Sequence, residues 1–237
     1  MVQGYLVEHW PHLLAMIWFL VCFRGYMQYA RAKSKTTACL ASVMHLYRLE
    51  WMRHMLMRDN RIPDTNAIAN LERTVAFFAS TTMLILAGLM TLLSAKDKAI
   101  SIVSEIPFSY PTGAGEWEFK LLLLLVLFVY AFFKFTWSLR QYGFVSVMVS
   151  GAPMPGEGFS DHRLEAHADR IAKMTSLAAN NFNTGLRTYY FCLAVLGWFI
   201  NPWLFMMASA TVVYVLYRRE FSSSTLHSLM MSAEGED

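Results

Sequence analysis

The sequence predicts an all-α, polytopic helical membrane protein with about five transmembrane segments and two amphipathic cytosolic helices. Of the 237 residues, 56% are hydrophobic and only 16% are charged, whereas soluble domains carry about 25% charged residues. The apolar residues form continuous blocks, unlike the alternating pattern of a membrane β-barrel. We expect a single membrane domain over residues 1–237, with cytosolic segments at 31–62 and 151–180 and a polar tail at 222–237.

A helix that passes from water into lipid is predicted after Asp64 in the stretch 58–94, where a polar half precedes an apolar half. Pro63 disfavours helix at the residue before it, and Asp64 suits the N-cap of the helix that follows. No charged residue lies between Arg73 and Lys96. The apolar part is about 20 residues long, or about 30 Å of helix, which matches the bilayer core.

One face of this helix carries mostly small residues at spacings of three and four: Ala76, Ser80, Met83, Ala87, Thr91 and Ser94. Small side chains let helix backbones approach closely in lipid, and we expect this face to pack against another helix. The alternative is a polar path lined by Ser80, Thr81, Thr82 and Asn201.

Two further spans are predicted at residues 13–26 and 121–137, the second in a helix that continues toward Ser150. The last apolar region, 188–217, is interrupted at Asn201 and is either one kinked helix or two spans in a hairpin. The successive non-membrane segments contain none, nine, two, five, none and two Lys or Arg. Because basic loops stay in the cytoplasm, this pattern favours the hairpin, with the N-terminus outside and the C-terminus inside. We expect the bacterial inner membrane as the location.

Two amphipathic helices are predicted at the cytoplasmic face. The first, within residues 36–57, has an apolar face of Leu40, Met44, Tyr47, Trp51 and Met55. The second begins near Ser160 or Asp161, with a less polar face of Leu164, Ala168, Ile171, Thr175 and Ala178. We expect these faces to be buried, and Arg48 and Arg53 to meet anionic lipid headgroups.

The metal-binding patterns in these helices are weak. His45 and His54 lie among methionines, but no thiolate accompanies them as a copper ligand. Asp161, Glu165 and Asp169 share a helix face, and a metal would need further ligands from elsewhere. No nucleophile–base motif, paired-histidine motif, phosphate loop or dinucleotide fingerprint occurs in the sequence. We therefore expect no catalytic residue, no cofactor and no resident metal.

The polar residues best placed for chemistry lie near one membrane face in the predicted topology. They are Arg61, Asp64, Asn70, Glu72, Arg73, Lys134 and Arg140. Helix capping and interfacial ion pairs account for residues of this kind. In the channel alternative, Arg73, Lys134 and Arg140 would instead form a basic inner mouth that attracts anions.

Six motifs together resemble an uncharacterised family of bacterial and plant integral membrane proteins. They are Trp51-Met-Arg, Asp59-Asn-Arg-Ile, Asn70-Leu-Glu-Arg, Phe77-Phe-Ala-Ser-Thr, Phe132-Phe-Lys-Phe-Thr-Trp-Ser-Leu-Arg-Gln-Tyr and Gly185-Leu-Arg-Thr-Tyr-Tyr-Phe. The family is catalogued as domain of unknown function 599, and the resemblance covers roughly residues 31–221. It implies a multi-span membrane protein and supplies no catalytic residues.

The leading functional hypothesis is a non-enzymatic, homo-oligomeric inner-membrane protein that acts as a scaffold or accessory subunit, alone or in a larger membrane complex. No Asp or Glu lies inside a predicted span, whereas ion-coupled transporters usually place one near the midplane. The alternative is a channel or passive transporter with a basic inner mouth, and a lipid-directed enzyme is a third class. Expected partners are membrane lipids, including anionic headgroups, and further copies of the chain, but not nucleic acid.

Overall fold

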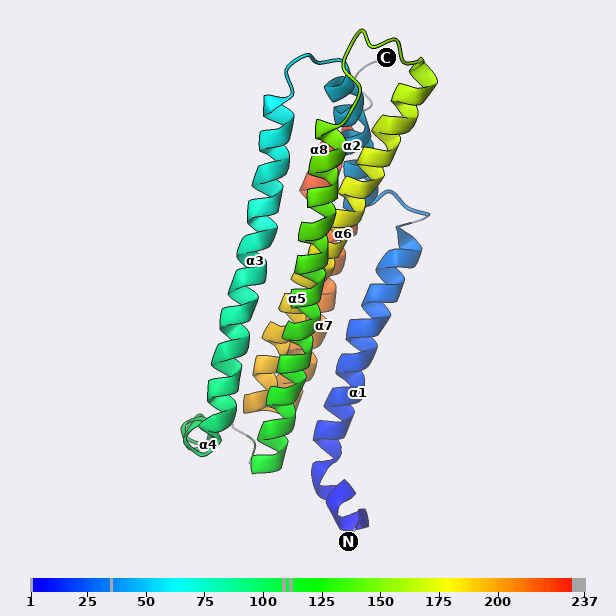
Figure 1. Ribbon diagram of the computed structural model, residues 1–237. Helices are drawn as coiled ribbons and strands as arrows, with labels where there is room; N and C mark the ends of the chain where they lie inside the picture. Colours follow the sequence, from blue (N-terminus) through cyan, green and yellow to red (C-terminus); the bar gives the residue numbers. More distant parts are fainter. Residues whose placement is uncertain (1, 35, 108–109, 111–112, 232–237) are drawn as a thin grey trace. The chain divides into compact units, whose positions relative to one another are not determined.

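The computed structural model describes residues 2–34, 36–107, 110 and 113–231, with side chains placed from Trp10 onward. Within these residues the chain forms eight helices and no strand, which confirms the all-α prediction (Figure 1). The helices are α1 (Val2–Lys33), α2 (Leu40–Leu56), α3 (Ile62–Ser94), α4 (Lys96–Ser104), α5 (Ala114–Ser150), α6 (Asp161–Ile200), α7 (Pro202–Phe221) and α8 (Ser224–Met231).

The chain divides into two compact units, and each is described by itself. Unit 1 comprises residues 1–37, 84–130 and 187–219, and unit 2 comprises residues 38–83, 131–186 and 220–237. Helices α3, α5 and α6 therefore contribute residues to both units, whereas α1 and α7 belong almost wholly to unit 1 and α2 and α8 to unit 2.

Three helices are long and apolar enough to cross a membrane. They are Trp10–Lys33 of α1, Ile62–Ser94 and Ala114–Ser150. Among the described residues, α6 and α7 do not meet the same criterion of length and hydropathy. Three of the five predicted spans thus meet this criterion. The other two do not, because the apolar part of α6 is short and α7 ends in charged residues.

The last apolar region is a helical hairpin formed by the end of α6 and by α7 (Figure 1). The rings of Trp198 and Phe205 stack with centroids 4.9 Å apart, and Arg219 Nη1 donates to the Tyr190 hydroxyl at 2.5 Å. In one continuous helix, Tyr190 and Arg219 would lie about 44 Å apart. The fold-back that was favoured over one kinked helix is therefore present, whereas the crossing of the membrane by both arms stays a prediction.

The start of α3 differs from the prediction. The helix begins at Ile62, whose N–H donates to Asn60 Oδ1 at 3.0 Å, so Asn60 and not Asp64 provides the capping oxygen. Pro63 lies in the first turn, where its missing N–H leaves no helix bond unmade. Asp64 is only 1% exposed because its side chain turns into unit 2.

Three segments are more helical than the sequence analysis expected. Helix α4 lies in the segment between the predicted spans that end at Ser94 and begin at Leu121, and α5 begins at Ala114 rather than near Leu121. The predicted polar tail contains α8, where Leu226 is buried and the Leu229 carbonyl accepts a hydrogen bond from the Tyr47 hydroxyl at 3.0 Å. Apolar residues three apart give α8 a face that packs on α2. Residues 232–237 of the tail lie outside the described residues.

The two amphipathic helices are present, and the buried face of the first differs from the prediction. In α2 the buried side chains are Met52, Met55 and Leu56, while Leu40, Tyr47 and Trp51 are only partly buried. In α6 the predicted face is largely buried, including Ala168, Ile171, Thr175 and Ala178. Two of the methionines considered as copper ligands therefore belong to the core of unit 2.

Candidate functional site

Asp64 is the centre of a buried polar contact in unit 2. Its Oδ1 accepts hydrogen bonds from Trp51 Nε1 at 2.7 Å and from Arg58 Nη1 at 2.8 Å. A carboxylate is buried at acceptable cost when a cation and a hydrogen-bond donor compensate it. Because Trp51 lies in α2 and Arg58 in the turn that follows, this contact fixes the α2–α3 connection.

Arg61 holds the linker between α5 and α6. Its Nη1 donates to the Ala152 carbonyl at 2.8 Å, and its Nη2 donates to the Pro153 carbonyl. Within the linker, Gly156 and Gly158 have φ angles of 90° and 73°, which L side chains rarely adopt. Arg61 therefore anchors a turn-rich segment and uses its donors on backbone carbonyls.

The other residues of the predicted cytoplasmic cluster make local contacts of their own. Arg73 Nη1 donates to Asn70 Oδ1 at 3.1 Å within one exposed turn of α3, and Glu72 is half-buried there. The guanidinium of exposed Arg140 lies 5.6 Å from the centre of the Phe144 ring. Apart from the Asn70–Arg73 pair, these contacts are with residues outside the predicted cluster.

Lys134, the last member of that cluster, belongs to a line of polar contacts between α5 and α6 that sequence reasoning missed. Lys134 Nζ donates to Asn181 Oδ1 at 3.2 Å, and Asn181 Nδ2 donates to Gln141 Oε1 at 2.8 Å. The buried Ser138 hydroxyl donates to the Ala178 carbonyl at 2.7 Å. The sequence signal was the presence of Gln141 and Asn181 at positions that their helices bury or half-bury.

Arg48 extends these polar contacts to α2. Its Nη1 donates to Ser176 Oγ at 3.4 Å, and His45 Nδ1 lies 2.9 Å from the same oxygen. Burial lowers the pKa of the Arg48 guanidinium, and the electrostatic interaction with Tyr142 opposes this shift. Arg48 is therefore half-buried and engaged by Ser176, and its contact with lipid headgroups stays a prediction.

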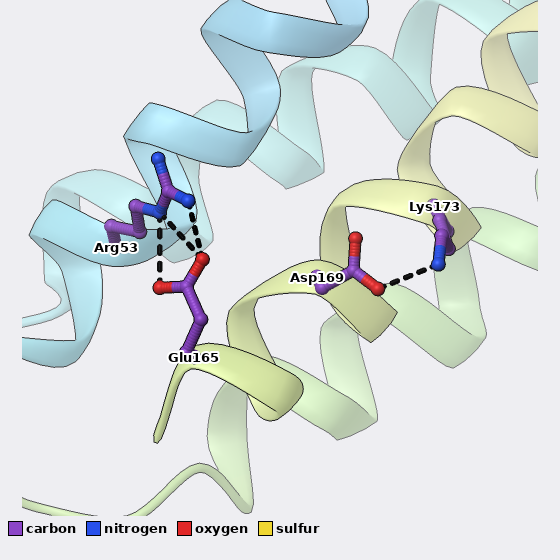
Figure 2. Close-up of polar contacts among 4 residues, drawn as sticks. All are labelled: Arg53, Glu165, Asp169 and Lys173. Carbon is purple, nitrogen blue, oxygen red and sulfur yellow. Dashed lines mark hydrogen bonds and ion pairs between the residues drawn. The ribbon is translucent and has the colours of Figure 1, made fainter. Parts of the chain in front are cut away.

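The predicted acidic face of α6 is engaged by cations, as Figure 2 shows. Arg53 Nε lies 3.0 Å and 3.1 Å from the two carboxylate oxygens of Glu165, and Lys173 Nζ lies 2.6 Å from Asp169 Oδ2. The hydrogen bonds from Arg53 lower the pKa of the Glu165 carboxyl. Arg53 thus ties α2 to α6 instead of pointing freely toward headgroups, and the described residues contain no cluster of three or more metal ligands.

Thr82 and Thr91 of α3 and Asn201 of the predicted polar path form short-range hydrogen bonds. Thr82 is buried and donates to the Phe78 carbonyl at 2.6 Å, and Thr91 donates to the Ala87 carbonyl at 3.1 Å. Ser80, Ala87 and Thr91 are exposed, and Thr81 is half-buried. Asn201 Oδ1 accepts the Trp203 N–H at 2.9 Å and so caps α7.

Unit 1 contains a cavity of about 250 Å³ that the sequence analysis did not anticipate. Its lining residues are His12, Leu13, Met16, Gly115, Glu116, Phe119, Lys120 and Trp198. Lys120 is only 1% exposed and His12 only 7% exposed. The available sequence signal was the Glu116–Lys120 pair, one helical turn apart at the start of the apolar run of α5.

The tautomer of His12 follows from its partner in this cavity. Trp198 Nε1 lies 3.0 Å from His12 Nδ1. Because an indole N–H can only donate, Nδ1 is the acceptor, and a neutral ring carries its proton on Nε2. That nitrogen lies 3.7 Å from Glu116 Oε2. The cavity therefore brings together a neutral imidazole, a carboxyl group and a buried ammonium.

No curated protein and no solved structure matches the chain. The protein family described as "Protein of unknown function, DUF599" matches residues 14–225. This match includes the residues of the polar contacts from Arg48 to Asn181 and every cavity residue except His12 and Leu13. The resemblance found in the six sequence motifs is confirmed, and the chain belongs to the DUF599 family of proteins of unknown function.

Proposed function

We propose that this protein is a non-enzymatic, homo-oligomeric membrane protein that serves as a scaffold or accessory subunit of the bacterial inner membrane. In this proposal α1, α3, α5 and the two arms of the α6–α7 hairpin form five spans, with the N-terminus outside and the C-terminus inside. The Lys and Arg counts of the connecting segments support this orientation.

The observation that carries the proposal is the exposure of the small-residue face of α3. Ser80, Ala87 and Thr91 are exposed, whereas the opposite side of the same helix buries Val75 and Leu89. Lipid does not require small side chains, because larger ones pack against acyl chains equally well. A helix from a second copy of the chain would use this face for close backbone approach, and a closed symmetric assembly would cover it on every copy.

The contacts of the polar residues support a structural role rather than a catalytic one. Arg61 and Arg53 each join segments that are distant in sequence, Asp64 joins the neighbouring helices α2 and α3, and each is engaged by a partner within unit 2. The bonds of Thr82 to Phe78, of Thr91 to Ala87 and of Asn201 to Trp203 are ordinary helix contacts and do not favour the channel alternative.

The test is the mass of the full-length protein in mild detergent, measured by native mass spectrometry and light scattering. We expect a closed oligomer that Ser80→Leu and Ala87→Leu each shift toward monomer, because a bulky side chain separates the helices. Leu92→Phe is the matched control, since it enlarges an exposed α3 residue about a third of a turn away from the small face. A folded monomer as the sole species of the unmodified protein would refute self-association.

A further inference from the structure

The cavity of unit 1 combines opposite charges in a mostly apolar lining. Lys120 and Glu116 lie one turn apart on α5 and both line the cavity, together with His12 from α1 and Trp198 from α6. An ammonium group buried to 1% exposure is costly unless negative charge compensates it. With a neutral His12, the Glu116–Lys120 pair leaves the cavity close to neutral overall.

This charge arrangement discriminates between classes of ligand. A simple anion would be attracted to Lys120 but repelled by Glu116. A simple cation would be attracted to Glu116 and to the Trp198 face but repelled by Lys120. A ligand that carries both charges can place each beside its opposite.

The positions of the groups suggest how such a ligand lies. Lys120 Nζ is 5.7 Å from the centre of the Trp198 ring, which places the ammonium on the Trp198 side of the cavity. Glu116 Oε2 lies near His12 Nε2, at 3.7 Å. The negative group of the ligand would therefore face Lys120, and its positive group would face Glu116.

The size and edges of the cavity limit the ligand further. About 250 Å³ is slightly below the roughly 300–1,000 Å³ of pockets for drug-sized ligands, so only a small molecule or a headgroup fits. Leu13 and Phe119 are 49% and 50% exposed, and they provide apolar edges to the polar cavity. Such edges suit the chains of a lipid whose headgroup enters the cavity.

We propose that this cavity binds a small zwitterion, with a primary ammonium group beside Glu116 and an oxyanion beside Lys120. The phosphoethanolamine headgroup of a membrane lipid has this chemistry, and so do free phosphoethanolamine and free amino acids. The site is independent of self-association through α3.

The first experiment measures which lipid the full-length protein retains. The protein is reconstituted into vesicles with equal parts of phosphatidylethanolamine, phosphatidylcholine and phosphatidylglycerol. Native mass spectrometry then identifies the lipids that stay bound to it. We expect preferential retention of phosphatidylethanolamine, because phosphatidylcholine has no ammonium N–H donor and phosphatidylglycerol has no positive group. Glu116→Gln and Lys120→Met should each lower this retention about tenfold or more, whereas Lys98→Met, which changes an exposed residue outside the cavity, should leave it unchanged. If Lys120→Met does not fold, the isosteric Glu116→Gln variant decides.

The second experiment separates the two sources of the ligand. Free phosphoethanolamine and glycine are titrated by calorimetry into the protein in phosphatidylcholine nanodiscs. Binding that Glu116→Gln abolishes, without any lipid preference, assigns the site to a free zwitterion and still supports the proposal. A preference for phosphatidylglycerol that depends on Lys120 would overturn the proposal and indicate an anion site. The absence of both a lipid preference and free-ligand binding would also overturn it.

Discussion

Replacing Gly185 with alanine should destabilise unit 2 through one identifiable clash. A Cβ at this position would lie 2.4 Å from Phe135 Cε1 and 2.8 Å from both Phe135 Cδ1 and Cζ. Carbon atoms in contact are normally about 3.5–4.0 Å apart, so the ring would have to move by about 1 Å. Phe135 is 0% exposed, with ring centres of Phe78 and Phe182 at 5.6 Å and 5.7 Å. The ring has little room to move.

The expected size of the effect follows from two opposing contributions. Overpacking a core costs about 1–3 kcal/mol. Alanine is more favourable than glycine inside a helix by about 0.5–1 kcal/mol, because glycine loses more backbone freedom on folding. The net expectation for Gly185→Ala is a loss of about 1–2 kcal/mol in the free energy of unfolding.

Gly143→Ala in α5 is the matched control. No heavy atom lies within 4 Å of the Cβ that it would add, so only the gain in helix propensity remains. Thermal unfolding of both variants in detergent, followed by near-ultraviolet circular dichroism, should give a lower midpoint for Gly185→Ala and an unchanged or higher midpoint for Gly143→Ala. A Gly185→Ala midpoint equal to or above that of the control would refute the packing argument.

Two further predictions concern charge. The pKa of Glu165 should lie below that of an ordinary glutamate and rise toward it in Arg53→Gln, as measured by carbon-13 NMR of labelled side chains. Since the pKa of Glu165 is lowered in the folded state, the stabilisation from the Arg53–Glu165 pair is present above the ordinary pKa of glutamate. It disappears as pH falls through the lowered pKa. An unchanged Glu165 pKa in Arg53→Gln would show that the ion pair does not cause the shift. For topology, reporter fusions after Lys98 and after Arg219 should report opposite sides of the membrane, with Arg219 cytoplasmic. Finding both reporters on one side would rule out the proposed five-span arrangement.

Local patterns in the sequence were sufficient for the class and for most elements. Continuous apolar blocks predicted an all-α protein, and periodicity predicted helices that the structure places at Leu40–Leu56 and from Asp161 onward. The break at Asn201 followed from Asn-Pro chemistry, and charge on both sides favoured the hairpin. These features depend on residues within a few turns of one another, and sequence spacing reports them directly.

The same local reasoning missed the hydrogen bonds that side chains make with other helices and turns. Asp64 is well suited to cap a helix, but Trp51 and Arg58 bind it and Asn60 provides the cap. Arg48 was expected to face headgroups, yet Ser176, in a helix far along the chain, accepts its hydrogen bond. The buried side of α2 includes Met55 as expected but is shifted toward Met52 and Leu56, since neighbouring helices determine which side of an amphipathic helix is covered.

The sequence alone determined the helical, membrane-type character of this protein, because hydropathy and helical period are properties of contiguous residues. Only the tertiary structure decided the partners of its polar groups and the existence of the unit 1 cavity. Arg53 meets Glu165 across 112 positions, and His12 meets Trp198 across 186. A cavity is the space left between side chains of several helices, and its chemistry depends on packing that no single segment specifies.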